Sequence, residues 1–121
     1  MKLKILPPTL RKNKRYIAID VISESPLTKD DLVIAIWDAC IRFKGELETS
    51  NFNLWLMRFY DINDSEDYYH YKAVIKCQRG FENQIRASLC VLTKYKNNSI
   101  AINSLGLSGT ISSAISKFIE N

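Results

Sequence analysis

The chain has 121 residues, of which 46% are hydrophobic and 25% are charged, a size and composition typical of one globular domain. Its three cysteines, Cys40, Cys77 and Cys90, form no CxxC pair and accompany a single histidine, which argues against a disulfide framework or a zinc site and favours a reducing compartment. No apolar run approaches the roughly 20 residues of a membrane helix, and Pro7 and Pro8 interrupt the segment where a signal peptide would be apolar. We therefore expect a cytoplasmic protein that contacts no membrane and itself binds no metal or cofactor.

The net charge of +4 is concentrated at the beginning of the chain. The first fifteen residues hold six basic side chains and no acidic one, whereas the other 106 residues hold 11 basic and 13 acidic side chains, a balance of −2. We predict an extended basic arm over residues 1–14, followed by a single α/β domain over residues 15–121. A local cationic arm favours a polyanionic partner, most simply nucleic acid; a frayed, solvated terminus is the plain alternative.

The first predicted elements after the arm are a strand and a helix. Residues 16–22 alternate in the way of a strand, with one fully apolar face. Thr28 and Asp31 form a capping-box pattern, which predicts a helix that begins at residue 28. The helix is expected to run to about residue 44, because Gly45 is a typical helix terminator.

In the rest of the chain, further strands and helices are expected. The further expected elements are a strand at 53–60, an acidic hairpin loop at 61–67, a strand at 69–77, a helix at 81–95, a strand at 100–105 and a final helix after 108–110. The order β-α-β-β-α-β predicts an α+β fold of the ferredoxin-like, RNA-recognition-like kind. We expect an antiparallel four-stranded sheet with an extra C-terminal helix.

The residues predict no catalytic site in this chain. His70 is alone on an alternating strand, where a histidine is most often a surface or packing residue, and no Ser/His/Asp or Cys/His arrangement is indicated. The carboxylates of 61–67 have no basic or apolar surroundings to tune them and are expected to form a solvated loop. No phosphate-binding glycine motif occurs.

Two features outside the arm are predicted to contact nucleic acid. Lys72 and Lys76 lie on the polar face of strand 69–77, where they would bind phosphates, although the sheet lacks the aromatic signature of a base-reading module. Segment 105–110 ends in a turn and a helix start, which favours an anion, although simple N-capping by Ser108 or Thr110 explains the same residues. The predicted RNA-binding residues are therefore Arg11, Lys12, Lys14, Arg15, Lys72, Lys76, Ser108, Gly109 and Thr110.

Two apolar surfaces exceed what one core should bury. The first is the helix at 28–44, whose apolar arc is wider than the stripe of a one-sided helix, and the second is one face of strand 53–60. Coverage by the last helix and the loops would explain both; the alternative is a protein interface, where aromatic residues and methionine are enriched. The candidate interface residues are Ile34, Trp37, Ile41, Trp55, Met57 and Phe59.

Four segments together resemble a known family. They are LPPTLRKNKRYI (6–17), DLVIAIWD (31–38), NLWL (53–56) and LGLSGT (105–110). In this order, over nearly the whole chain, they resemble the archaeal component 2 group of the Pop/Rpp family of ribonuclease P proteins. One departure is segment 61–71, which is longer and more acidic than the short glycine-containing turn expected there.

The resemblance implies a role that composition does not. Ribonuclease P removes the 5′ leader of precursor tRNA, with hydrolysis carried by its RNA subunit and Mg2+, so this chain would be a non-catalytic subunit that binds and scaffolds the RNA. It would pair with ribonuclease P protein component 3, in a heterotetramer that contains two copies of this chain, beside other ribonuclease P proteins. The alternatives are a ferredoxin-like ligand-binding or oligomerisation module without RNA, and a small ferredoxin-like enzyme.

Overall fold

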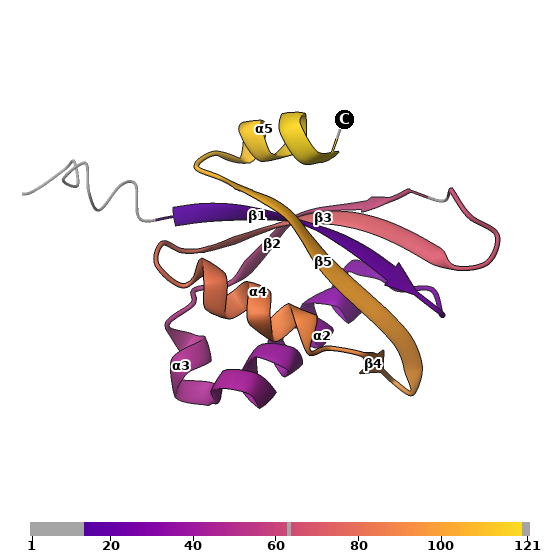
Figure 1. The fold of residues 1–121 in the computed structure, drawn as a ribbon, viewed down its shortest axis with the longest axis horizontal. Coiled ribbons are helices and arrows are strands. Elements are labelled where there is room, and N and C mark those ends of the chain that lie inside the picture. The colour runs from indigo at the N-terminus through magenta and orange to yellow at the C-terminus, as the bar shows by residue number, and fades with distance from the viewer. Residues whose placement is uncertain (1–13, 63, 120–121) are drawn as a thin grey trace, which may run out of the picture.

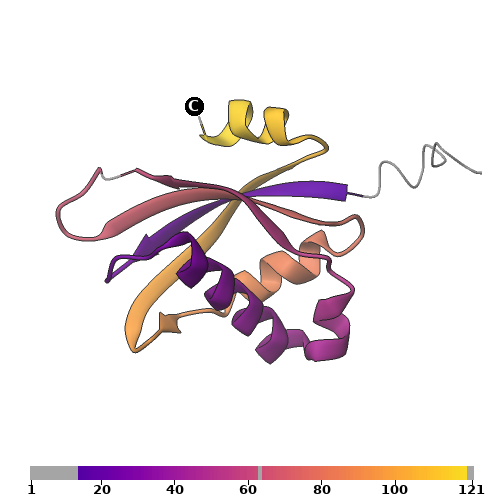
Figure 2. The same cartoon turned by 180° about the vertical axis from the view of Figure 1, so that it is seen from behind.

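The computed structural model describes residues 14–62 and 64–119. Its elements in chain order are β1 (Lys14–Ser23), α2 (Lys29–Lys44), α3 (Glu46–Ser50), β2 (Trp55–Asp61), β3 (Tyr69–Gln78), α4 (Glu82–Cys90), β4 (Lys94–Tyr95), β5 (Asn98–Ser108), α5 (Ile111–Ala114) and a π-helical segment η1 (Ile115–Ile119). The five strands form one antiparallel sheet in the order β2-β3-β1-β5-β4. Helices α2, α3 and α4 cover one face, which we call the helical face, and α5 with η1 lies on the opposite, outer face (Figures 1 and 2).

The α+β class is confirmed, but the sheet has five strands and not the four that we expected. The difference arises in the segment expected as a helix over 81–95, because α4 ends at Cys90 and Lys94–Tyr95 form the short strand β4. Lys96 and Asn97 both have positive φ, 51° and 67°, and so make a tight turn that returns the chain into β5. A strand of two residues is too short to show alternation, so the sequence interpretation extended the helix through β4.

The local signals of helix α2 are confirmed in detail. The hydroxyl of Thr28 accepts a hydrogen bond from the Asp31 amide at 3.1 Å, and the Asp31 carboxylate accepts one from the Thr28 amide at 3.0 Å. The bond from the Thr28 amide is the main reason why the pKa of Asp31 is lowered. Gly45, with a φ of 88°, ends the helix as expected, and a short helix α3 that the sequence did not predict follows directly.

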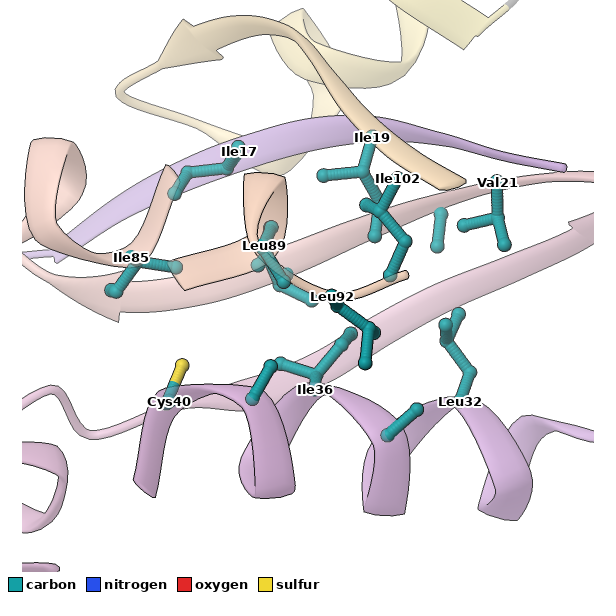
Figure 3. Close-up of a cluster of buried hydrophobic side chains, with 14 of the residues drawn as sticks. Ile17, Ile19, Val21, Leu32, Ile36, Cys40, Ile85, Leu89, Leu92 and Ile102 are labelled. Carbon is teal, nitrogen blue, oxygen red and sulfur yellow. The ribbon is translucent and has the colours of Figure 1, made fainter. Parts of the chain in front are cut away.

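The hydrophobic core lies between the sheet and the helical face (Figure 3). Ile17, Ile19 and Val21 point from β1 into this layer and are fully buried, as their alternation predicts. They meet Leu32 of α2 and Leu89 of α4, also buried, so residues distant in sequence form one core. Each such side chain contributes about 1.5–3 kcal/mol through burial, enough to hold the sheet rigid behind any surface site.

The outer face is partly covered by the end of the chain. Ala18 of β1 is fully buried, and so is Ala114 of α5. The ring of Phe118 packs against Gly106 of β5 so closely that any β-carbon at position 106 would overlap it. The C-terminal segment thus covers the β1 and β5 part of the outer face and reaches the middle of β3, where Val74 is fully buried, while Trp55 at the start of edge strand β2 stays exposed (Figure 1).

A β-bulge corrects one expectation about β2. Trp55, Met57 and Phe59 were expected on one face, but the register shifts between Leu56 and Arg58, which adds a residue and reverses the alternation. Trp55 pairs with Lys76 and belongs to the outer face, whereas Phe59 belongs to the helical face and stacks on Tyr71 with ring centroids 5.1 Å apart.

Among the described residues, no helix has the length and apolar character needed to cross a membrane.

Candidate nucleic-acid interface

Several predicted RNA-binding residues meet at one end of the sheet, where β1 begins and β5 ends (Figure 1). Tyr16 of β1 pairs with Lys76 of β3 on one side and with Ser108 of β5 on the other, and Lys14 pairs with Gln78. We call this region, with Lys14, Arg15, Lys76 and residues 108–110, the basic end. Of the predicted set, Arg11 and Lys12 lie outside the described residues, and Lys72 lies elsewhere on the sheet.

Arg15 lies close to two neighbours at the basic end and forms an ion pair with one of them. Its Nε lies 3.6 Å from Oε2 of Glu82, the first residue of α4, and a β-carbon on Gly109 would be 3.9 Å from its Nη1. Two-thirds of the side chain is shielded from solvent. Arg15 therefore joins the start of α4 to the turn after β5, and Glu82 offsets part of its charge.

The turn at 108–110 is capped by its own side chains. The hydroxyl of Thr110 accepts a hydrogen bond from the Ser113 amide at 3.2 Å, and the hydroxyl of Ser108 accepts one from the Thr110 amide at 3.4 Å. N-capping, the simpler explanation of these residues, is thus present, and α5 has only four residues. Gly109 is the exposed, uncrowded position of the turn and the one that leaves room for a ligand to approach the backbone.

Lys72 and Lys76 share a face but have different neighbours. Lys76 lies between Tyr16 and Trp55 in the register, and its Nζ is 5.9 Å from the centroid of the Trp55 ring. Lys72 lies opposite Asp20, four residues earlier in β3. Only Lys76 therefore belongs to the basic end.

The opposite end of the sheet contains a carboxylate–imidazole–carboxylate cluster, Asp20, His70 and Asp64, which we call the acidic end. His70 Nδ1 is 2.9 Å from Oδ1 of Asp64, and its Nε2 contacts the Asp20 carboxylate. Burial acts to lower the pKa of His70, but hydrogen bonds to Asp20 and Asp64, and then their charges, outweigh it and raise the pKa. A protonated imidazole donates to both carboxylates and ties the 61–67 loop to the sheet.

The sequence missed this cluster for a reason of register. His70 and Asp20 are not directly opposite, because His70 pairs with Ile22 and Asp20 with Lys72, so their contact is diagonal across two strands. Asp64 comes from a loop that we expected to be simply solvated; that expectation is wrong for Asp64. Strand alternation could have placed Asp20 and His70 on the same face of the sheet. No sequence signal indicates the loop conformation that brings Asp64 to His70.

The described part of the chain offers no activated nucleophile among its buried thiols. Burial raises the pKa of Cys40 to about 11 and that of Cys77 to about 12, so both thiols are protonated at neutral pH. No three His, Cys, Asp or Glu side chains within residues 14–62 and 64–119 are arranged to hold a metal ion.

The apolar candidates divide between a groove and open surface. Trp37 and Trp55 line a groove between α2 and β2 with a volume of about 440 Å³. Ile34 is 56% exposed, and Ile41 is also exposed, on α2. The structure thus brings Trp37 and Trp55 together and does not bring Phe59 to them.

Comparison with known proteins gives matches over nearly the whole chain. A family model described as the Rpp14/Pop5 family matches residues 15–119. A Methanobrevibacter smithii protein named ribonuclease P protein component 2 is 51% identical over 120 residues, which are 99% of each chain. Proteins of the same name from Methanothermobacter thermautotrophicus and Pyrococcus furiosus are 48% and 40% identical, over 98% and 97% of this chain and 94% and 92% of their own.

Proposed function

The chain belongs to the Rpp14/Pop5 family, and from this membership we infer that it is a protein subunit of ribonuclease P, the endoribonuclease that removes the 5′ leader of precursor tRNA. The observation that carries the inference is the 51% identity over 99% of the chain to a protein named ribonuclease P protein component 2. The archaeal relatives and the order of the matching segments support the same assignment.

The chain acts without catalytic residues of its own. Its buried thiols are protonated, and both ring nitrogens of its single histidine contact carboxylates. Hydrolysis is then the task of the RNA subunit, with Mg2+ that this chain does not bind. The protein contributes cations that let phosphate-rich RNA segments approach each other.

RNA contact is assigned to the basic end and to the arm that precedes it in the sequence. The arm supplies Arg11 and Lys12, the start of β1 supplies Lys14 and Arg15, and β3 supplies Lys76. A phosphate would approach the backbone of Gly109 in the turn after β5, where no side chain obstructs it. Lys72, Ser108 and Thr110 stay candidates, with Thr110 already engaged as a helix cap.

Protein contact is assigned to α2 and the groove beside it. Ile34 and Ile41 expose apolar surface there, and Trp37 lines the groove. The partner is ribonuclease P protein component 3, in a heterotetramer with two copies of this chain, within a cytoplasmic complex that contains further ribonuclease P proteins. The long strands in the order β2-β3-β1-β5, with α2 and α4 as crossovers, support a ferredoxin-like, RNA-recognition-like unit as the frame.

Reconstitution tests the assignment. Ribonuclease P RNA and component 3 are assembled with and without this chain, and cleavage of precursor tRNA is measured over a Mg2+ titration. The chain is expected to lower the Mg2+ concentration at which cleavage begins. Cleavage that is the same at every Mg2+ concentration when the chain is omitted would remove the assignment.

A further inference from the structure

The open part of the outer face combines an exposed aromatic ring with cations. Trp55 is 60% exposed at the start of edge strand β2, and its indole N–H donates to Oδ1 of Asn53 at 3.2 Å, which holds the ring in one orientation. Lys76 lies across from it on β3, with Nζ 5.9 Å from the ring centroid. Arg58 follows on the same face of β2, after the bulge. We call Trp55, Arg58 and Lys76 the tryptophan patch.

The charge around this patch is of one sign. The outer-face positions of β2 and β3 hold no acidic side chain: they are Trp55, Arg58, Tyr60, His70, Lys72, Val74, Lys76 and Gln78. The nearest carboxylate on this face is Asp20, opposite Lys72, and it is engaged by His70. Glu82 belongs to α4 on the helical face, where it pairs with Arg15. A polyanion therefore meets no repulsion at the tryptophan patch.

From this arrangement we propose that the tryptophan patch binds unpaired nucleotides of an RNA, with one base stacked on the Trp55 ring and the adjacent phosphates on Lys76 and Arg58. The proposal rests on the assigned role in ribonuclease P and names the kind of RNA element that is bound there. Base–aromatic stacking beside cations is how proteins hold single strands without reading their sequence. A double helix keeps its base faces stacked inside, so an exposed ring selects an unpaired base.

The tryptophan patch gives Trp55 a role that differs from the sequence interpretation. Trp55 was assigned to a protein interface with Met57 and Phe59, but the bulge separates it from Phe59 and places it beside Lys76. Trp55 also lines the groove next to Trp37, so a protein that fills this groove is the competing occupant. A cation 5.9 Å above the ring suits a phosphate-bearing ligand better than an apolar one.

The two tryptophans of the chain allow a direct test. The variant Trp37→Phe leaves Trp55 as the only indole, and Trp55→Phe leaves Trp37 in the α2–β2 groove. Each full-length variant is titrated with a single-stranded adenylate oligonucleotide of about 12 nucleotides and with ribonuclease P RNA, while tryptophan fluorescence is recorded. Quenching is expected for Trp55 and not for Trp37, since only the ring of Trp55 stacks on a base.

Affinity measurements give the second readout. Trp55→Ala is expected to weaken oligonucleotide binding by about 5- to 150-fold, the range for loss of one stacked base. Leu47→Ala, at an 85% exposed position of α3, is the matched control and should leave binding unchanged. Lys76→Gln should reduce the salt slope of binding by about 0.7, whereas Lys44→Gln, the same change at the end of α2, should not.

The outcomes separate this proposal from the assigned function. If both RNAs bind while Trp55 fluorescence and the affinity of Trp55→Ala are unchanged, the patch is not an RNA site, although the chain still binds RNA. If component 3 quenches Trp55 and RNA does not, the occupant is protein and the proposal is overturned. The role as a subunit is judged apart from both, by the Mg2+ dependence of the reconstituted enzyme.

Discussion

The two ends of the sheet differ in charge: one end carries cations, and the other carries carboxylates that share a histidine. At the basic end, Lys14 and Lys76 form no ion pair within residues 14–62 and 64–119, and at the acidic end Asp20 and Asp64 share His70. Lys76 and His70 are six positions apart on β3, about 20 Å along a strand. Because charges are screened over about 8–10 Å in physiological salt, each end acts on a partner independently.

The difference separates the total charge of a region from the charge that is free to bind a polyanion. Cations at the basic end remain available, since among the ion pairs of the described residues Arg15 is the one cation there with an acidic partner. Asp20 and Asp64 at the acidic end share one imidazole within the fold, which offsets part of their negative charge when it is protonated. The acidic end therefore stabilises the hairpin between β2 and β3, and the basic end is the proposed contact with RNA.

The largest expected effect comes from removing the arm. Deleting residues 1–13 takes away Lys2, Lys4, Arg11 and Lys12 and spares Lys14, the first residue of β1. The salt slope of binding to ribonuclease P RNA should fall by about 3, and affinity in roughly 0.1 M salt should fall about 100-fold. Binding isotherms over a salt series measure both. An unchanged slope would exclude the arm from the RNA contacts.

Charge reversal on β3 compares the two ends directly. Lys76→Glu at the basic end should weaken RNA binding by about tenfold, because a phosphate contact is lost and a repulsion is added. Lys72→Glu, on the same face and strand but opposite Asp20, should cost less than about threefold. Equal losses from the two variants would mean that RNA lies along the whole strand.

A smaller effect is expected from a methyl group in the turn. A β-carbon on Gly109 meets only the Arg15 guanidinium at 3.9 Å, an ordinary contact, so Gly109→Ala should fold with an unchanged melting temperature. If a phosphate approaches the backbone there, RNA binding should weaken by about threefold. Full affinity in a normally folded Gly109→Ala protein would remove the turn from the interface.

The acidic end should affect stability and not RNA binding. Since the pKa of His70 is raised in the folded state, the stabilisation is fully present below the unfolded value near 6.5 and is lost as pH rises through the folded pKa. Thermal melts should therefore show stability falling above neutral pH in the native chain and little such dependence in His70→Gln. RNA affinity should be the same for both proteins at one pH. A pH dependence that persists in His70→Gln would assign it to another group.

The sequence predicted what local chemistry determines. Thr28 and Asp31 identified the start of α2, Gly45 its end, and alternation identified the buried face of β1, since each signal lies within a few residues. Sequence reasoning failed for β4, for the bulge in β2 and for the His70 cluster. These depend on a turn with positive φ, one extra residue in a register, and a diagonal contact between strands, none of which has a local periodic signal.

The central claim is that RNA binds at the basic end of the sheet and not at the acidic end. It is tested most directly with a probe that is tethered at each end in turn and cuts any RNA nearby. Because Cys40 and Cys77 are buried with raised pKa values, Cys90→Ser leaves no reactive thiol among the described residues. In this background, Lys14→Cys and Asp67→Cys carry an iron chelate that generates hydroxyl radicals near ribonuclease P RNA. Strong, localised cuts from position 14 and few from position 67 are expected. Cuts of equal strength from both positions, or stronger cuts from position 67, would contradict an RNA interface at the basic end.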